Sequence, residues 1–386
     1  MRYRSILCVF LVFVIGGVVF VAARGMANAF PQRDLGGYWV AAHLASQNPY
    51  SLQRSAEFER SIGNLETVPP LVRNPPWAIV LVLPLAWFSY QTAYALWAIL
   101  SVVLVAGCAR AAWNLSGAEA SLAPAFLSLL FGPTLVLLML GQITVLVLLG
   151  VMLFLYLVER RRDWLAGASL LLIVLKPHIA LFFLLAVVLW SIRSRRWAIL
   201  ASGALALTVA CVAALLMNPH IFSQYLDLAK QFPHETELYP NLGGILYAAT
   251  GHHGWAVLPQ VIGMGWLAFY WRRHCADWDW QTDGELALLV SVVCSYHSFP
   301  YDEILFLPAL MPAFANGNRR NFLVGFIVTN AGYALYMGKV AGRFGFGHVS
   351  MWWTASAWLV TYLVSRRARA REAVAPPLRV AGADGV

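Results

Sequence analysis

The chain has 386 residues, of which 60% are hydrophobic and only 12% carry a formal charge. Soluble domains carry about 25% charged residues, so this composition excludes an ordinary soluble protein with a polar surface. The net charge of +9 does not indicate nucleic-acid binding, because the basic residues form short clusters between long apolar runs instead of one patch. Such clusters are typical of the cytoplasmic loops of membrane proteins. We therefore predict an all-α, polytopic transmembrane protein that lies in the bilayer and binds no nucleic acid.

The first apolar run, Ile6 to Ala23, follows Arg2 and Arg4 and is predicted to cross from the cytoplasm outward. Its apolar stretch is longer than that of a typical signal peptide, which favours a retained span over a cleaved leader. The polar segment 24–74 is then the first outer loop.

The region between Pro75 and the arginine cluster at Arg160 is less regular. Pro76 to Phe88 is a short predicted span, and Tyr90 to Ala109 is a longer one. The breaks that follow in the apolar sequence are Pro124, Phe131-Gly132-Pro133 and Gly141-Gln142. Backbone exposed at such breaks must be buried in protein or line a cavity. Because the charge rule requires an odd number of crossings before Arg160, we expect three crossings plus a broken or re-entrant piece.

A tight hairpin is predicted between Arg162 and Arg193, with Lys176-Pro177-His178 at its tip. Each arm has roughly a dozen residues, too few to span a bilayer at about 1.5 Å per residue. Lys176 and His178 are therefore expected within the outer half of the membrane or in a water-filled vestibule.

The rest of the chain continues the pattern of apolar runs. A second outer loop is expected over 218–254, and a basic, disordered cytoplasmic tail over 366–386. The later predicted spans are Trp197–Met217, Trp255–Tyr270, Leu286–Ser295, Ile304–Phe314, Phe322–Tyr336 and Met351–Val364. The total is ten to thirteen spans in one domain, residues 1–365. The five cysteines have neither the spacing of a disulfide framework nor that of a zinc site.

Ionisable residues at membrane depth cost about 2.5–3.5 kcal/mol each, so every one is a functional candidate. Asp34, Lys176, His178 and the segment 296–303 are all expected on the outer side. Alternatives remain for each of them. Asp34 could be only the N-cap of an interfacial helix, and Lys176 a snorkelling interface residue instead of an anion ligand. Asp302 could simply pair with a neighbouring cation, and His178 could be a hydrogen-bonded core histidine. Gln142 could satisfy a broken helix instead of contacting substrate.

The outer segments resemble glycosyltransferase family 87. The resemblance begins with Asp34-Leu-Gly-Gly-Tyr38 and covers roughly residues 30–310. Its further motifs, in chain order, are Asn48-Pro49-Tyr50, Asn74-Pro75-Pro76, Gly141-Gln142-Ile-Thr144, Leu175-Lys176-Pro177, Asn241-Leu-Gly-Gly and His297 through Tyr301-Asp302 to Pro308. Two departures are Gly36-Gly37, where many relatives have bulkier residues, and Thr144, where the family often has Asn.

The resemblance implies a GT-C-like enzyme of the inner (plasma) membrane whose active site faces the periplasm or exterior. Such an enzyme moves a hexose, typically mannose, from a polyprenyl-phosphate donor to a lipid or glycan acceptor. It implies that Asp34 is the catalytic carboxylate. With a phosphate as leaving group, one general base suffices and displacement inverts the anomeric centre. Lys176, with His178 or Arg73, is the expected phosphate ligand.

The remaining candidates are expected to contact substrate: Tyr38, Gln142, His297, Tyr301 and Asp302. The scheme calls for no metal and no cofactor besides the donor lipid. A retaining mechanism would need a second carboxylate about 5–5.5 Å away, for which Asp302 is the candidate. The alternatives are a transporter or flippase of a lipid-linked sugar, whose broken helices look similar, and a structural membrane subunit.

Overall fold

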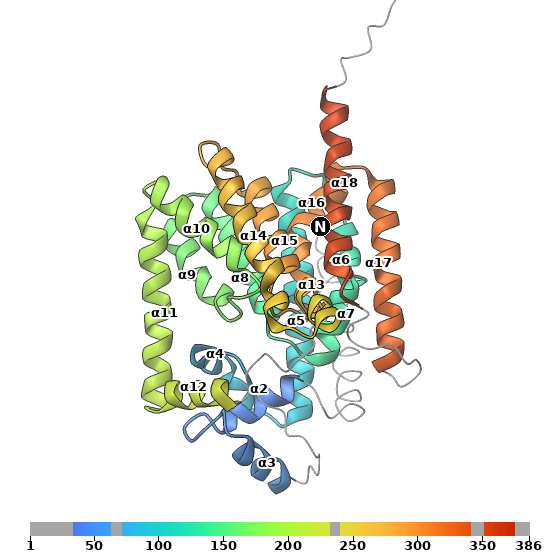
Figure 1. The fold of residues 1–386 in the computed structure, drawn as a ribbon. Helices are drawn as coiled ribbons and strands as arrows, with labels where there is room; N and C mark the ends of the chain where they lie inside the picture. The colour runs from blue at the N-terminus through green and yellow to red at the C-terminus, as the bar shows by residue number, and fades with distance from the viewer. Residues whose placement is uncertain (1–33, 63–71, 232–239, 341–350, 375–386) are drawn as a thin grey trace, which may run out of the picture.

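The computed structural model describes residues 34–62, 72–231, 240–340 and 351–374. These residues form helices and no strand, which confirms the all-α prediction (Figure 1). The predicted first span, Ile6 to Ala23, lies outside them. In chain order the helices are α2 (Asp34–His43), α3 (Leu52–Ser61), α4 (Pro76–Val82), η1 (Leu83–Trp87), α5 (Tyr90–Leu115), α6 (Ala123–Leu129), α7 (Gly132–Leu140), α8 (Thr144–Glu159), α9 (Asp163–Ile173), α10 (Leu181–Arg193), α11 (Trp197–Met217), α12 (Ile221–Gln231), α13 (Leu242–Thr250), α14 (His253–His274), η3 (Trp280–Gly284), α15 (Glu285–Cys294), η4 (Pro300–Phe306), α16 (Leu307–Asn316), α17 (Arg319–Val340) and α18 (Thr354–Val374).

Membrane-spanning helices are present, as the composition predicts. In the described part of the chain, α5 and α11 are long and apolar enough to cross a bilayer. The α6–α7 pair is a third candidate, bent by 59° at its break. Several other expected crossings are helices of 10–17 residues. The number of ten to thirteen spans therefore stays a prediction, because proline and glycine breaks divide the apolar runs into pieces shorter than a bilayer.

The helices form a bundle with two different ends. Figure 1 shows α2, α3, α4 and α12 together at one end, which we call the α2 end. The α10–α11 turn, with Arg193, Arg195 and Arg196, and the C-terminal part of α18 lie at the opposite end, which we call the arginine end. The basic residues at the α2 end, Arg54 and Arg60 of α3 and Lys230 of α12, are isolated and have acidic residues nearby on the same helices. The arginine cluster of the α10–α11 turn has no counterpart in these helices, which is the bias that the positive-inside rule describes.

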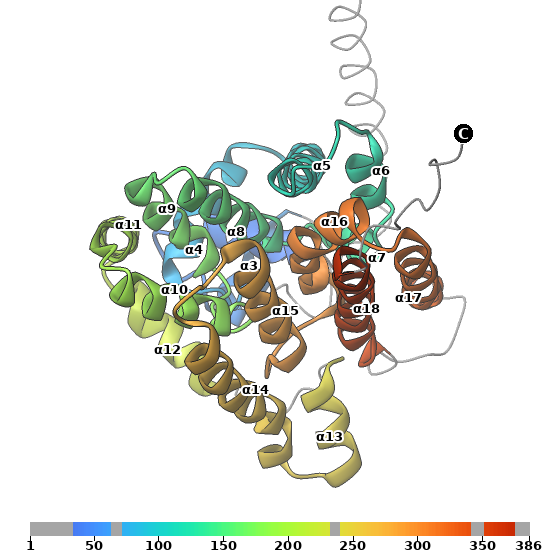
Figure 2. The same ribbon diagram turned by 90° about the horizontal axis from the view of Figure 1, so that it is seen from above.

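The centre of the bundle is apolar. Viewed along the helices in Figure 2, α11 and α17 lie on opposite flanks, and α8, α15 and α16 lie between them. Leu148, Leu288 and Met311, one from each of these central helices, are 0% exposed. This core anchors the shorter segments that carry the polar residues.

The segment Pro76–Phe88 differs from the predicted short span. It divides into α4 and the 3₁₀ helix η1, which has Pro84 in its first turn. Twelve helical residues reach about 18 Å, well short of a bilayer about 30 Å thick. The segment instead packs on α2 at the α2 end, where the indole of Trp39 donates to the carbonyl of Phe88 at 2.9 Å (Figure 1). The bent α6–α7 pair is the broken piece that the sequence predicts between α5 and α8.

The predicted hairpin is present. Its arms are α9, with 11 residues, and α10, with 13, and Lys176 lies in the turn between them. Helix α9 packs closely on α11 through Gly167, where an added Cβ would come within 2.1 Å of the Ile199 carbonyl oxygen. The hairpin is therefore held at a fixed depth in the bundle.

The predicted second outer loop and the predicted tail both contain helices. The predicted second outer loop, 218–254, carries α12, α13 and the start of α14. The predicted disordered tail begins at residue 366, yet α18 continues to Val374.

Candidate active site

Asp34 is the first residue of α2 and is half-buried. The helix behind it is buried on all sides, with Leu35, Val40 and Ala41 at most 1% exposed. Such burial by the rest of the protein is not typical of a helix that lies on a membrane surface. The Asp34 carboxylate Oδ2 accepts a hydrogen bond from Nε2 of Gln142, 108 positions away in the sequence. Asp34 thus lies at the edge of the buried core, in contact with a distant segment.

The break between α7 and α8 brings Gln142 to Asp34. Gly141 ends α7 in the left-handed conformation, at φ +69°, and its N–H donates to the carbonyl of Leu137. A Cβ on Gly141 would come within 2.7 Å of Cβ of Leu35, the residue after Asp34. Glycine is needed here both for its positive φ and for the close approach of α2.

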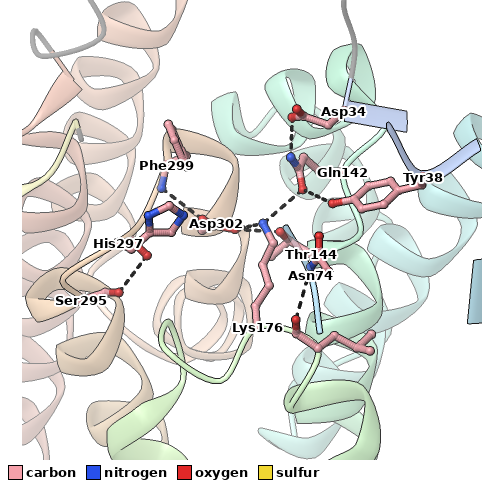
Figure 3. A network of polar contacts seen from close by, with 11 residues as sticks. Asp34, Tyr38, Asn74, Gln142, Thr144, Lys176, Ser295, His297, Phe299 and Asp302 are labelled. Carbon is pink, nitrogen blue, oxygen red and sulfur yellow. Dashed lines mark hydrogen bonds and ion pairs between the residues drawn. The ribbon is translucent and has the colours of Figure 1, made fainter. Parts of the chain in front are cut away.

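The Gln142 carboxamide is the centre of a polar network (Figure 3). Its Oε1 accepts hydrogen bonds from Oη of Tyr38 at 3.2 Å and from Nζ of Lys176 at 3.1 Å. Its Nε2 donates to Asp34. Gln142 is only 3% exposed, so these partners satisfy a side chain that water hardly reaches.

Lys176 forms a buried ion pair with Asp302. Its Nζ lies 2.9 Å from Oδ1 of Asp302 and 4.6 Å from the centroid of the Tyr301 ring. The same Oδ1 accepts from Oγ1 of Thr144 at 2.7 Å. Oδ2 accepts from the backbone N–H of Phe299 at 3.1 Å, at the start of η4. A buried ion pair is tolerated only when its remaining hydrogen-bonding capacity is satisfied in this way.

These contacts bear on the role of Asp302. The residue is 0% exposed and both of its carboxylate oxygens accept hydrogen bonds. That is the environment of a counter-ion and helix cap. It argues against Asp302 as the second catalytic carboxylate that a retaining mechanism would need.

The two histidines lie next to one another. The ring centroids of His178 and His297 are 5.0 Å apart, and both rings are half-buried. Oγ of Ser295 donates to the backbone carbonyls of both residues, at 3.3 Å and 3.0 Å. The His297 ring is 5.4 Å from that of Phe299, which precedes η4. The pair therefore adjoins the segment that carries Tyr301 and Asp302.

Arg73 is half-buried and directly precedes Asn74. Nδ2 of Asn74 donates to the carbonyl of Leu175 at 3.3 Å, one residue before Lys176. The structure therefore brings Asp34, Tyr38, Gln142, Lys176, Tyr301 and Asp302 into one network. His178, His297 and Arg73 lie in segments that adjoin it.

Burial controls the ionisation of Asp34. Desolvation raises the pKa of this carboxyl above its ordinary value, and the hydrogen bond from Gln142 and the charge of Lys176 oppose that rise. The charge of Asp302 adds a small further rise. An acid with a raised pKa is a stronger base once ionised, which suits proton abstraction from a hydroxyl.

Sequence reasoning missed two contributors. Thr144 was noted only as a departure from the family pattern, yet its hydroxyl binds Asp302. Asn241 caps α13 through Gly244 N, and its Nδ2 donates to the carbonyls of Ser295 and Tyr296 at 3.2 and 3.3 Å. Asn before a helix was a visible capping signal. Its second role depends on residues more than fifty positions away.

No cluster of three or more His, Cys, Asp or Glu side chains suited to a metal ion occurs among the described residues. The four cysteines among them, Cys108, Cys211, Cys275 and Cys294, are free.

Comparison with known proteins identifies the family. A search of curated proteins and one of solved structures found no match to the chain. The family model described as glycosyltransferase family 87 matches residues 73–296, which is more than half of the 386 residues. That range includes Gln142, Lys176 and Asn241 and the whole hairpin. With its all-α, membrane-spanning architecture, the chain belongs to glycosyltransferase family 87 and is a membrane glycosyltransferase.

Proposed function

We propose that this glycosyltransferase moves a hexose, most simply mannose, from a polyprenyl-phosphate donor to a hydroxyl of a lipid or glycan acceptor. The observation that carries this proposal is the position of Asp34, a half-buried carboxylate joined through Gln142 to the only lysine of the network. We further propose that the α2 end faces the periplasm or exterior of the plasma membrane, because the arginine end has the charge of a cytoplasmic face (Figure 1).

Asp34 is the proposed general base. The acceptor oxygen forms a bond to the anomeric carbon while its proton passes to the Asp34 carboxylate. The bond between that carbon and the phosphate oxygen breaks, and the electron pair leaves with the phosphate. One displacement inverts the anomeric centre, which agrees with the counter-ion environment of Asp302.

Lys176 is the proposed ligand of the departing phosphate, where it offsets the charge that develops on the leaving group. Because Lys176 already pairs with Asp302 at 2.9 Å, a donor phosphate must share the ammonium group with that carboxylate. His178 and Arg73 adjoin the network and are proposed to supply further donors. Tyr38, Tyr301 and His297 provide the aromatic and hydroxyl surfaces for the sugar.

The direct test is transfer from a labelled polyprenyl-phosphate sugar by membranes that carry the protein. Asp34→Asn should abolish transfer while expression stays at the wild-type level. Asp227→Asn is the matched control, because Asp227 is an exposed residue of α12 at the same end of the bundle (Figure 1), and it should keep full activity. Full transfer by Asp34→Asn would refute the proposed base. Movement of the lipid-linked sugar across the membrane without transfer would favour a flippase.

Lys176→Ala should raise the KM for the donor at least tenfold and leave the KM for the acceptor unchanged. An unchanged donor KM would remove Lys176 from the phosphate site. Glycolipid profiles of wild-type and deletion cells would name the sugar and the acceptor, because the missing product contains both.

A further inference from the structure

The chemistry of Gln142's neighbours determines the orientation of its side-chain amide. A lysine ammonium group only donates hydrogen bonds, so the amide atom that faces Lys176 at 3.1 Å must be the acceptor, Oε1. The other amide atom, Nε2, then faces Asp34 and donates to it. Turning the amide round would place two donors, Nε2 and Lys176, against each other.

Lys176 is in turn held by Asp302. The ammonium group bonds Oδ1 of Asp302 at 2.9 Å. Thr144 of α8 and the N–H of Phe299, the residue before η4, fix that carboxylate. Asp302, Lys176 and Gln142 are 0%, 7% and 3% exposed, so water does not compete for these bonds. Asp302 thus contacts Lys176, Lys176 contacts Gln142, and Gln142 contacts Asp34. Asp302 is the most buried of the four residues and Asp34 is half-buried.

We infer that Gln142 is the positioning residue of Asp34, and that the Lys176–Asp302 ion pair acts on Asp34 by fixing the Gln142 amide. This inference rests on the proposed function for its catalytic meaning, but the contact itself is a property of the folded protein. It differs from both sequence-based interpretations of Gln142, which are contact with substrate and satisfaction of a broken helix. In physical terms, the N–H of Gln142 has a fixed direction, holds one carboxylate oxygen of Asp34 in place and favours the ionised form of Asp34.

A test of this inference must leave the titratable groups around Asp34 unchanged. Among the described residues, the charges of Lys176 and Asp302 act on Asp34. Tyr38, Tyr301 and Tyr336 are titratable neighbours that the charge of Asp34 reaches. Gln142→Met removes the amide without changing any of these groups and keeps the length of the side chain. It should therefore report the loss of the hydrogen bond alone.

The ionisation of Asp34 can be measured without substrate. Carbodiimides react with the protonated carboxyl group, and trypsin cleavage after Arg33 and Arg54 yields a peptide whose only carboxyl side chain is Asp34. The experiment follows labelling of that peptide against pH in the full-length protein in detergent. Gln142→Met should move the labelling midpoint upward by about one pH unit, since a stabilising hydrogen bond to the carboxylate is lost.

Three further variants complete the test. Gln281→Met, in η3, should leave the midpoint unchanged. Gln281 lies six residues after Cys275, whose carbonyl accepts from Arg193 at the arginine end. Lys176→Ala should raise the midpoint in the wild-type background. In the Gln142→Met background its effect should be clearly smaller, because part of the influence of Lys176 passes through Gln142. If Lys176→Ala shifts the midpoint equally in both backgrounds, the inference that Lys176 acts on Asp34 through Gln142 is overturned. An unchanged midpoint in a Gln142→Met protein that melts at the wild-type temperature would overturn the role of Gln142.

Kinetics separate positioning from substrate contact. If the wild-type protein transfers sugar, Gln142→Met should lower kcat at least tenfold, shift the acid limb of the pH profile upward and leave the donor KM unchanged. A rise in donor KM alone would show that Gln142 contacts substrate and would overturn the inference. Absence of transfer by the wild-type protein would refute the proposed function, while the labelling midpoint would still decide the role of Gln142.

Discussion

Asp34 combines a functional position with a cost to stability. Because burial raises its pKa in the folded protein, its ionised form is less favourable there than in the unfolded chain. The sign follows from the raised value: the stability that the neutral form contributes is present at low pH and is lost as pH rises through the folded-state pKa. The structure holds a carboxylate at the site in spite of this loss.

Replacing the carboxyl group should therefore stabilise the protein. Asp34→Asn is expected to raise the melting temperature in detergent at pH 8, by roughly a few degrees, and to raise it less at pH 4. The measurement is thermal unfolding of both proteins at the two pH values. A lower melting temperature for the variant at pH 8 would mean that the ionised carboxylate is stabilised by its surroundings.

Gly141 is the second residue whose identity the site requires. Gly141→Ala should lower activity and stability together, because the new Cβ meets Leu35 and displaces Asp34 from Gln142. Gly251→Ala is the matched control: Gly251 also ends a helix at positive φ, +70°, but an added Cβ would meet nothing within 4 Å. Alanine at a positive φ costs about 1 kcal/mol of backbone strain, and this cost is the same in both variants. The comparison measures melting temperature and transfer, and equal losses in the two variants would argue against the Leu35 contact.

At the scale of elements, the 3₁₀ helix η4 connects the site to the C-terminal helices. It carries Asp302 on the network side and Glu303 beside it. The Glu303 carboxylate accepts from Tyr333 Oη of α17 and from Thr354 Oγ1 at the start of α18, both at 2.6 Å. Sequence patterns gave no signal for Glu303, because both partners are distant in the chain.

Loss of one of these bonds should loosen η4. Tyr333→Phe leaves a buried carboxylate oxygen without its donor, which costs about 1–3 kcal/mol. We expect a lower melting temperature and, through Asp302, a lower kcat. Tyr156→Phe is the control, because Tyr156 is an exposed tyrosine of α8 and should change neither. A wild-type melting temperature for Tyr333→Phe would show that η4 is held by its apolar packing alone.

The predicted and observed helix boundaries show which structural features local sequence patterns can predict. The range Trp197–Met217 was predicted and observed for α11, because the arginine turn before it and Asn218 after it are clear local signals. For Pro76–Phe88 the sequence predicts a short span, whereas in the structure the segment is divided into α4 and η1 and packs against α2. Apolar runs of about a dozen residues cannot be assigned to bilayer or protein core by composition.

At the scale of the whole molecule, the two ends of the bundle define a direction for the membrane. The arginine end and the α2 end are separated by the long helices α5 and α11 (Figure 1). If the arginine end is cytoplasmic, the α2 end, which carries Asp34, lies on the outer side.

Cysteine labelling in intact cells tests this orientation. In a variant without the five native cysteines, Ser61→Cys in α3 should react with a membrane-impermeant maleimide. Ser194→Cys in the α10–α11 turn should react only after the membrane is permeabilised. Both positions are exposed, so accessibility within the protein does not differ. The reverse labelling pattern would place the site in the cytoplasm and refute the proposed use of an outward-facing donor.

The sequence by itself determined the class of the protein and the candidates for its chemistry. Apolar runs, arginine clusters and a few ionisable residues act through local physics: the cost of moving a charge or an unpaired peptide group into hydrocarbon. Only the tertiary structure decided how those candidates meet. Asp34, Gln142 and Lys176 are more than thirty positions apart, and their contacts depend on the left-handed turn at Gly141 and on the buried Asp302. The direction of a hydrogen bond depends on both partners, and no local pattern contains both.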